Sequence, residues 1–293
     1  MKRFVFYIFY AVNWVVTLLP LSLLYGLSPL FYLILYHIAG YRREVVMKNL
    51  ANAFPEKNDE ELVNISKKFY RHLSDLFVEV LKLQHMRPAE IKKRYKLNNP
   101  ELLSRLFKQG KSTIAVFGHY GNWEWYGCLP LLIEYKFVTV YKPLKNSFFD
   151  RYFQNFRSQY GTILVPMAKT GRVLYQYKSE GTKILLGLIA DQTPPKREIH
   201  YWTKFMNQDT PIYMGIEKLS HRYNMPVVYF RLDKVKRGYY EVNPEMIAED
   251  PSKLGPNEIT EKHVRLLEEH IRNRPELWMW SHRRWKHKKP EDK

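Results

Sequence analysis

Residues 112–125 read STIAVFGHYGNWEW, an apolar run rich in β-branched residues from Ser112 to Phe117 and then a turn with Gly118 and Gly121. Short β-rich runs of this kind, separated by helix-like segments, recur at 137–141, 162–165, 184–189 and 227–230. Such alternation predicts an α/β fold with a mostly parallel central sheet flanked by helices. Because reactive residues in these folds gather at the carboxyl ends of strands, we expect the residues after Phe117 to belong to a site.

His119 and Glu124 lie on either side of Gly121, directly after the first apolar run. A histidine that takes a proton from a hydroxyl group works best with a carboxylate that fixes its tautomer and offsets the imidazolium charge. Residues five apart on one helix diverge by roughly 140°, so the pair meets only if the chain turns at Gly121. We predict that His119 is a general base for acyl transfer and that Glu124 orients it. The alternative is a buried histidine and a glutamate that only favours a helix dipole.

The N-terminal section differs from the rest, because Phe4 to Tyr41 contain no Asp, Glu, Lys or Arg. A membrane span needs about 20 apolar residues, so this longer run must be interrupted, and Pro20 and Pro29 are the expected kinks or ends. We predict a membrane anchor at 1–41, either a span with a docked helix or a re-entrant hairpin, and one catalytic domain at 42–293. A cleaved signal peptide is the alternative, but the apolar run is too long for one and lacks a small-x-small cleavage site.

The composition favours a lipid partner over a nucleic acid. With 47 basic and 29 acidic residues the formal net charge is +18, which attracts anionic lipid headgroups or nucleic acid. The apolar N-terminus favours lipid, and the chain has no zinc-ligand spacing, Gly-rich clamp or RNP-like pattern of a nucleic-acid module. Cys128 is the only cysteine, so we expect a packing residue and no disulfide within the chain. A metal hydrolase is disfavoured because His119 and Glu124 lack a third ligand within the motif.

Several short blocks follow one another along the chain: R-x5-NL-x2-AFPE at 43–56, HYGNWE at 119–124, YKP at 141–143 with Asn146, Arg157 with Gly161, Ala190-Asp191-Gln192, Thr210-Pro211, and WSHRRW at 280–285. Together with the apolar N-terminus, these blocks resemble the late acyltransferases of lipid A biosynthesis, the lauroyl and myristoyl transferases related to glycerolipid acyltransferases. The resemblance runs nearly end to end. Lys142 departs from it, since the family commonly has Arg there, and Lys lacks the bidentate guanidinium fork.

The resemblance implies an acyltransferase that moves a fatty acyl chain from acyl carrier protein to a hydroxyl of a lipid A precursor, an anionic glycolipid. It implies a bacterial inner membrane protein with its catalytic domain on the cytoplasmic face, in contact with membrane lipid and without cofactor, metal or nucleic acid. Catalysis is assigned to His119 and Glu124. Substrate binding is assigned to Arg157, Asp191, Gln192, Lys142 and Asn122, and contact with headgroups to Arg283, Arg284 and Trp285.

Several roles stay open at this point. Arg157 neutralises a phosphate or an oxyanion, or is a plain surface residue, and Asp191 with Gln192 orients the acceptor, supports His119 from behind, or caps a turn. The acceptor is alternatively a lysophospholipid, an aminolipid or a mannosylated phosphoinositide. Glu180-Gly181-Thr182-Lys183 is similar to a block of the lysophosphatidate acyltransferases, but its place before the run 184–189 indicates a helix that ends at Gly181.

Overall fold

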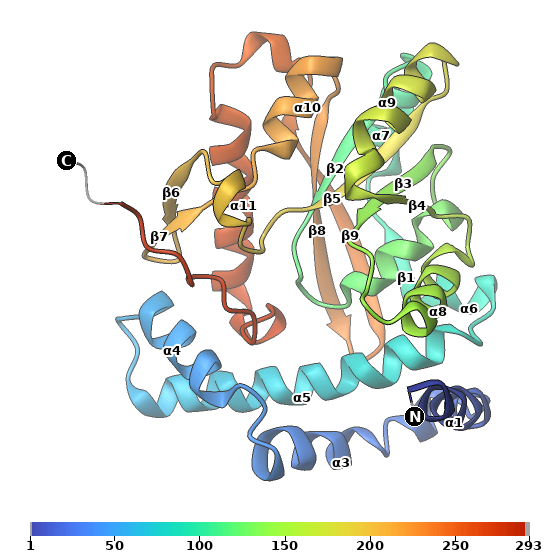
Figure 1. Ribbon diagram of the computed structural model, residues 1–293, viewed down its shortest axis with the longest axis vertical. Helices are drawn as coiled ribbons and strands as arrows, with labels where there is room; N and C mark the ends of the chain where they lie inside the picture. Colours follow the sequence, from blue (N-terminus) through green and yellow to red (C-terminus); the bar gives the residue numbers. More distant parts are fainter. Residues whose placement is uncertain (1, 291–293) are drawn as a thin grey trace.

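The computed structural model describes residues 2–290, and within them a seven-stranded sheet has the order β1-β9-β8-β2-β5-β3-β4 (Figure 1). Strands β8, β2, β5, β3 and β4 are parallel, whereas β9 is antiparallel to β8 and parallel to β1. The predicted α/β fold with a mostly parallel sheet is confirmed. The strands are β1 (Tyr95–Leu97), β2 (Thr113–Phe117), β3 (Lys136–Tyr141), β4 (Ile163–Pro166), β5 (Ile184–Ile189), β8 (Val227–Lys236) and β9 (Tyr239–Ala248).

Two apolar cores lie on the two faces of this sheet. Successive strand residues point to opposite faces, so Ile114 and Val116 enter one core and Ala115 and Phe117 the other. The first core packs against α9 (Thr170–Ser179), α10 (Gly215–Tyr223) and α11 (Glu258–Asn273). The second core packs against α6 (Pro88–Arg94), α7 (Pro100–Lys108), the 3-10 helix η2 (Trp123–Leu131) and α8 (Ser147–Ser158).

Helix α5 (Asp59–Leu83) lies across one end of the sheet, with the N-terminal helices beyond it (Figure 1). It begins with a capping box, in which the Asn58 side chain accepts from the backbone of Glu61 and the Glu61 side chain accepts from the backbone of Asn58. Most of its apolar residues at helical spacing, including Phe69, Leu73, Leu76 and Leu83, are buried. The preceding helix, α4 (Arg43–Ala53), packs on α5.

The apolar N-terminus forms α1 (Lys2–Val16), α2 (Leu21–Leu24), α3 (Ser28–Tyr32) and a π-helical turn η1 (Leu33–Ile38). Pro20 precedes α2 and Pro29 lies in the first turn of α3, so both prolines mark helix starts, where a missing N–H is tolerated. By length and composition alone, Leu21–Ile38 is able to cross a membrane, and only 22% of it is buried in the protein.

The remaining elements are short. A two-stranded hairpin, β6 (Trp202–Phe205) with β7 (Gln208–Pro211), lies outside the main sheet. The 3-10 turns are η3 (Met167–Lys169), η4 (Lys196–Glu198), η5 (Pro251–Lys253) and η6 (Pro275–Leu277). The predicted helix end at Gly181 is confirmed, because this residue follows α9 with a φ of +66°.

Candidate active site

The parallel pairing of β2 with β5 brings His119 and Asp191 together. Phe117 lies opposite Ile189 in the register of these strands, and each strand ends at that residue. His119 and Asp191 each follow two residues later, so they leave the sheet side by side at its carboxyl end. Gly118 is needed on the way, because a Cβ there would lie 2.8 Å from Leu267 Cδ1.

Asp191 holds both the ring and the backbone of His119. Its Oδ1 lies 2.6 Å from His119 Nδ1, and its Oδ2 accepts the backbone N–H of His119 at 2.7 Å. Burial raises the pKa of Asp191, but the charge of His119 and the hydrogen bonds from His119 and Trp278 outweigh this and lower it to about 2. An ionised carboxylate only accepts hydrogen bonds, so Nδ1 of His119 bears a proton and, in the neutral ring, Nε2 is free to accept one.

Gln192 contacts the other nitrogen of the same ring. Its amide Nε2 lies 3.1 Å from His119 Nε2, and with Nδ1 protonated this amide is the donor. The Gln192 amide therefore occupies the position from which a hydrogen-bond donor reaches Nε2 of His119. Among the roles left open by the sequence, the contacts of Asp191 and Gln192 are those of residues that support His119.

The predicted contact between Glu124 and His119 is wrong, and Arg157 is the partner of Glu124. Arg157 donates from Nε to Glu124 Oε2 at 2.8 Å and from Nη2 to Oε1 at 2.6 Å. The physical reason is the turn at Gly121, where φ is +58°: it directs Glu124 along η2 toward α8, while Asp191 already occupies Nδ1 of the imidazole. Close approach of η2 and α8 is possible because Gly127 has no Cβ, which would lie 3.3 Å from the Arg157 carbonyl oxygen.

His119 of the first pair and both residues of the second pair line one cavity of about 250 Å³. Burial lowers the pKa of Arg157, but its hydrogen bonds to Glu124 and the charge of Glu124 outweigh this and raise it, so the guanidinium stays charged beside the cavity. Lys142 adds a second cation to the wall. The rest of the wall combines polar side chains, among them Thr139, Thr162 and Gln192, with the aromatic and aliphatic side chains of Phe117, Trp123, Tyr126, Phe137, Val140, Tyr141, Leu164 and Ile189.

Two of the residues predicted to bind substrate or headgroups lie elsewhere. Asn122 is 0% exposed, is not part of the cavity wall and donates to Glu79 at 2.7 Å. Arg284 is 1% exposed and donates to the Pro211 carbonyl oxygen, so a role at the headgroup layer is wrong for this buried side chain. Arg283 is exposed, and the half-buried Trp285 donates to Thr210 Oγ1.

The C-terminal segment instead holds His119 and its partner Asp191. Trp278 donates from Nε1 to Asp191 Oδ2 at 2.8 Å, and the backbone N–H of Met279 donates to the His119 carbonyl oxygen at 3.1 Å. Neither Trp278, which stands two residues before the WSHRRW block, nor Glu79 was predicted as a site residue. Glu79 shares its face of α5 with the buried His72 and Lys82, so its position did not stand out, and the sequence alone gave no signal for Trp278.

Cys128 is buried, and burial raises its pKa, so its thiol is a packing group. Among residues 2–290, no group of three or more His, Cys, Asp or Glu side chains has the arrangement of a metal site. A model of the family described as bacterial lipid A biosynthesis acyltransferase matches residues 1–287. A comparison with curated proteins gives no match.

Proposed function

The chain belongs to the bacterial lipid A biosynthesis acyltransferase family, and from this premise we propose that it moves a fatty acyl chain from the thioester of acyl carrier protein to a hydroxyl of a lipid A precursor. The observation that supports this most directly is the His119–Asp191 pair, whose imidazole lines a cavity that also contains aromatic and aliphatic side chains. An acyl chain needs apolar walls, and a hydroxyl nucleophile needs a base.

In this mechanism the acceptor hydroxyl replaces the Gln192 amide at Nε2 of His119. The hydroxyl proton passes to Nε2 as the oxygen forms a bond with the thioester carbon, and Asp191 stabilises the imidazolium that results. The tetrahedral intermediate then breaks its C–S bond, and the imidazolium returns the proton to the leaving sulfur. The acyl group ends as an ester, the carrier as a free thiol, and the base is regenerated.

Arg157 and Lys142 supply the positive charge that this chemistry uses. Arg157 is fixed by two hydrogen bonds to Glu124, which leaves its remaining N–H groups for an acceptor phosphate or for the oxyanion of the intermediate. A donor placed in advance at a developing oxyanion typically contributes about 10²–10³ in rate. In this scheme Glu124 acts through Arg157, as a residue that positions a cation, while Asp191 acts through His119.

The surface of the chain fits a membrane-bound reaction with an acidic protein donor. Carrier proteins are acidic, so a net charge of +18 steers the donor and a phosphorylated acceptor toward the enzyme. The N-terminal helices expose apolar side chains to the surroundings, and they lie beyond α5 (Figure 1). We place them in the cytoplasmic leaflet of the inner membrane, where the lipid acceptor is embedded. These side chains include Phe4, Ile8, Val12, Val15, Leu18, Leu23, Leu30 and Ile38.

The test is transfer by purified protein from lauroyl-, myristoyl- and palmitoyl-acyl carrier protein to separate acceptors, with products measured by mass spectrometry. The acceptors are a phosphorylated glucosamine disaccharide with 3-hydroxyacyl chains, a lysophospholipid, an aminolipid and a phosphoinositide mannoside. We expect an added acyl ester on the disaccharide alone, and loss of about 10²–10⁴-fold in rate with His119→Ala. Transfer only to one of the other acceptors would reject the proposed acceptor, and an unchanged rate for His119→Ala would reject the proposed base.

A further inference from the structure

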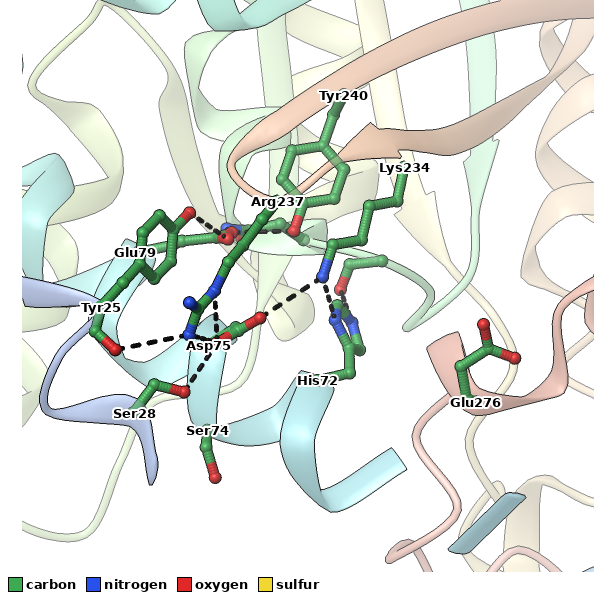
Figure 2. Close-up of polar contacts among 12 residues, drawn as sticks. Tyr25, Ser28, His72, Ser74, Asp75, Glu79, Lys234, Arg237, Tyr240 and Glu276 are labelled. Carbon is green, nitrogen blue, oxygen red and sulfur yellow. Dashed lines mark hydrogen bonds and ion pairs between the residues drawn. The ribbon is translucent and has the colours of Figure 1, made fainter. Parts of the chain in front are cut away.

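Besides Asp191, a second buried carboxylate contacts the loop at 118–122 that contains His119. Glu79 of α5 is 0% exposed, and its carboxylate lies between the phenol groups of Tyr25 and Tyr240 (Figure 2). Tyr25 donates to Oε1 at 2.8 Å, Tyr240 donates to Oε2 at 2.8 Å, and the Asn122 amide donates to Oε2 at 2.7 Å. The donors come from three separate parts of the chain: the turn after α2, strand β9 and the loop that follows β2.

Asn122 belongs to the same short loop as the proposed base. It stands three positions after His119, and its own side chain is fully buried. Its Oδ1 has no hydrogen-bond partner among the described residues, so the bond to Glu79 is the one polar contact that fixes this side chain. A carboxylate accepting from an amide is stronger than a neutral hydrogen bond, and it holds the loop against α5.

Helix α5 holds the loop at a second point two turns earlier. His72 Nε2 lies 3.2 Å from the Gly121 carbonyl oxygen, and His72 Nδ1 lies 3.3 Å from Lys234 Nζ (Figure 2). An ammonium group only donates, so Nδ1 accepts and Nε2 donates to Gly121. Burial lowers the pKa of His72 to about 3, which keeps the ring neutral in this arrangement.

Stability alone does not account for Glu79. A buried carboxylate costs free energy even when it is hydrogen-bonded, and an apolar side chain of similar size often serves as well. Burial raises the pKa of Glu79, and the charge of Lys234 together with the three hydrogen bonds offsets only part of this effect. The Glu79 carboxylate is therefore unfavourable as a packing group, but it is well suited to fix the Asn122 amide in one position.

We propose that Glu79 is a positioning residue for acyl transfer, which through Asn122 fixes the loop that presents His119 to the acceptor hydroxyl. This inference rests on the proposed role of His119 as the base. The loop is clamped between α5 on one side and the C-terminal segment on the other, where Gly121 N–H donates to the Leu277 carbonyl oxygen at 3.0 Å. A displacement of about 1 Å at a reacting group costs up to about 100-fold in rate, so a loop held to α5 by the His72 contact alone should present His119 less accurately.

The chain offers a conservative variant that separates positioning from charge. In Glu79→Gln the remaining oxygen still accepts from Asn122 and Tyr240, while the new amide donates to the Tyr25 hydroxyl, which is able to accept. Glu79→Ala removes the acceptor, and Asn122→Ala removes the donor. Ser28→Ala is the matched control, because it removes a partly buried hydrogen bond to Asp75, which lies on the same helix as Glu79, and Ser28 does not contact the loop.

The experiment combines steady-state kinetics with amide hydrogen exchange of full-length protein. We expect kcat to fall about 10- to 100-fold in Glu79→Ala and Asn122→Ala, with KM within about threefold of wild type. The double variant should be no slower than the slower single variant, because both changes break one contact. Glu79→Gln should keep kcat within about threefold of wild type, and Ser28→Ala should be unchanged.

Exchange of the peptide that contains 118–124 should be faster in both alanine variants and unchanged in Glu79→Gln and Ser28→Ala. This measurement needs no substrate, so it reports on the clamp even if wild-type protein transfers nothing from acyl carrier protein, which would count against the proposed function only. Three results would each overturn the positioning role. These are a kcat of Glu79→Gln as low as that of Glu79→Ala, a loss of kcat in the double variant equal to the product of the single losses, and unchanged exchange in both alanine variants.

Discussion

Trp278 Nε1 donates a 2.8 Å hydrogen bond to Oδ2 of Asp191, the same oxygen that accepts the backbone N–H of His119. The indole therefore fixes the carboxylate that fixes the base. Trp278→Phe keeps most of the packing volume and removes only this donor. Because a hydrogen bond to a charged group contributes about 1.5–3 kcal/mol, we expect kcat to fall by about 10-fold or more in the transfer assay.

Trp280→Phe is the matched control for that change. Trp280 donates its indole N–H to the Pro275 carbonyl oxygen and does not contact Asp191, so we expect lower thermal stability with kcat close to wild type. Equal losses of kcat in the two variants would show that Trp278 acts through the packing of the segment and not through Asp191.

Asp191→Asn should be nearly as damaging as loss of His119. The asparagine amide donates to Nδ1 where the carboxylate accepts from it, so the ring proton moves to Nε2 and the base loses its lone pair. We expect kcat to fall by about 10²–10⁴-fold with the circular dichroism spectrum unchanged. Retention of more than a tenth of wild-type kcat by a folded Asp191→Asn protein would contradict the assignment of Asp191 as the partner of His119.

Glu124 and Arg157 should behave as one unit, separate from the base. Because the two side chains share two hydrogen bonds, Glu124→Ala, Arg157→Ala and the double variant should lose similar amounts of kcat/KM, about 10- to 100-fold. Asp191→Asn combined with Glu124→Ala should instead give the product of the single losses, since the pairs have no shared contact. A double-mutant cycle on kcat/KM measures both comparisons, and full additivity between Glu124 and Arg157 would contradict the first.

Much of the fold was predictable because its signal is local. The runs that became β2, β3, β4, β5 and β8 are apolar and bounded by helix-like segments, and the α5 capping box is visible as Asn58 and Glu61. Strand β9 was missed because its sequence, YYEVNPEMIA, mixes charged residues, Asn and Pro with apolar ones. Strand β1 and the two strands of the β6–β7 hairpin are too short to show the alternation of apolar and polar residues that identifies a strand.

The site was predictable in its residue types but not in their pairing. His119, Glu124, Arg157, Lys142 and Gln192 were all singled out from motifs, and all line one cavity. Which carboxylate meets the imidazole depends on β2 lying next to β5 with Phe117 opposite Ile189, a long-range register that no local pattern reports. Glu124 was predicted as the partner of His119 because it is close along the chain, whereas Asp191 is the partner because the fold brings it close in space.

The buried histidines predict a loss of stability in mild acid. Burial lowers the pKa of His263 from 6.5 to about 4, so the folded chain leaves this ring neutral over a range in which the unfolded chain protonates it. The unfolded state then binds more protons than the folded state between pH 6.5 and 4. For this residue, the free energy of unfolding therefore decreases by about 1.4 kcal/mol for each pH unit of acidification in this range. Denaturant unfolding of wild type and His263→Gln across this range should show a flatter profile for the variant.

The exposed His200 provides the control for that measurement. Its side chain lies at the surface, so His200→Gln shows whether the exchange of a histidine for glutamine by itself changes the slope between pH 6.5 and 4. The same slope in His263→Gln as in wild type would show that His263 does not stay neutral in the folded protein.

The exposed apolar side chains of the N-terminal helices predict direct binding to lipid. Leu23 and Leu30 are 62% and 53% exposed, and burying a leucine in an apolar phase contributes about 1.5–3 kcal/mol. The double change Leu23→Asp with Leu30→Asp should therefore weaken partition into phosphatidylethanolamine and phosphatidylglycerol vesicles by about 100-fold or more, measured by flotation. Tyr175 is 70% exposed on α9, and α9 lies at the opposite end of the molecule from these helices (Figure 1), so Tyr175→Asp should float like wild type. Equal flotation of the double variant and wild type would mean that the basic surface alone holds the protein on the vesicle, and high salt would then release it.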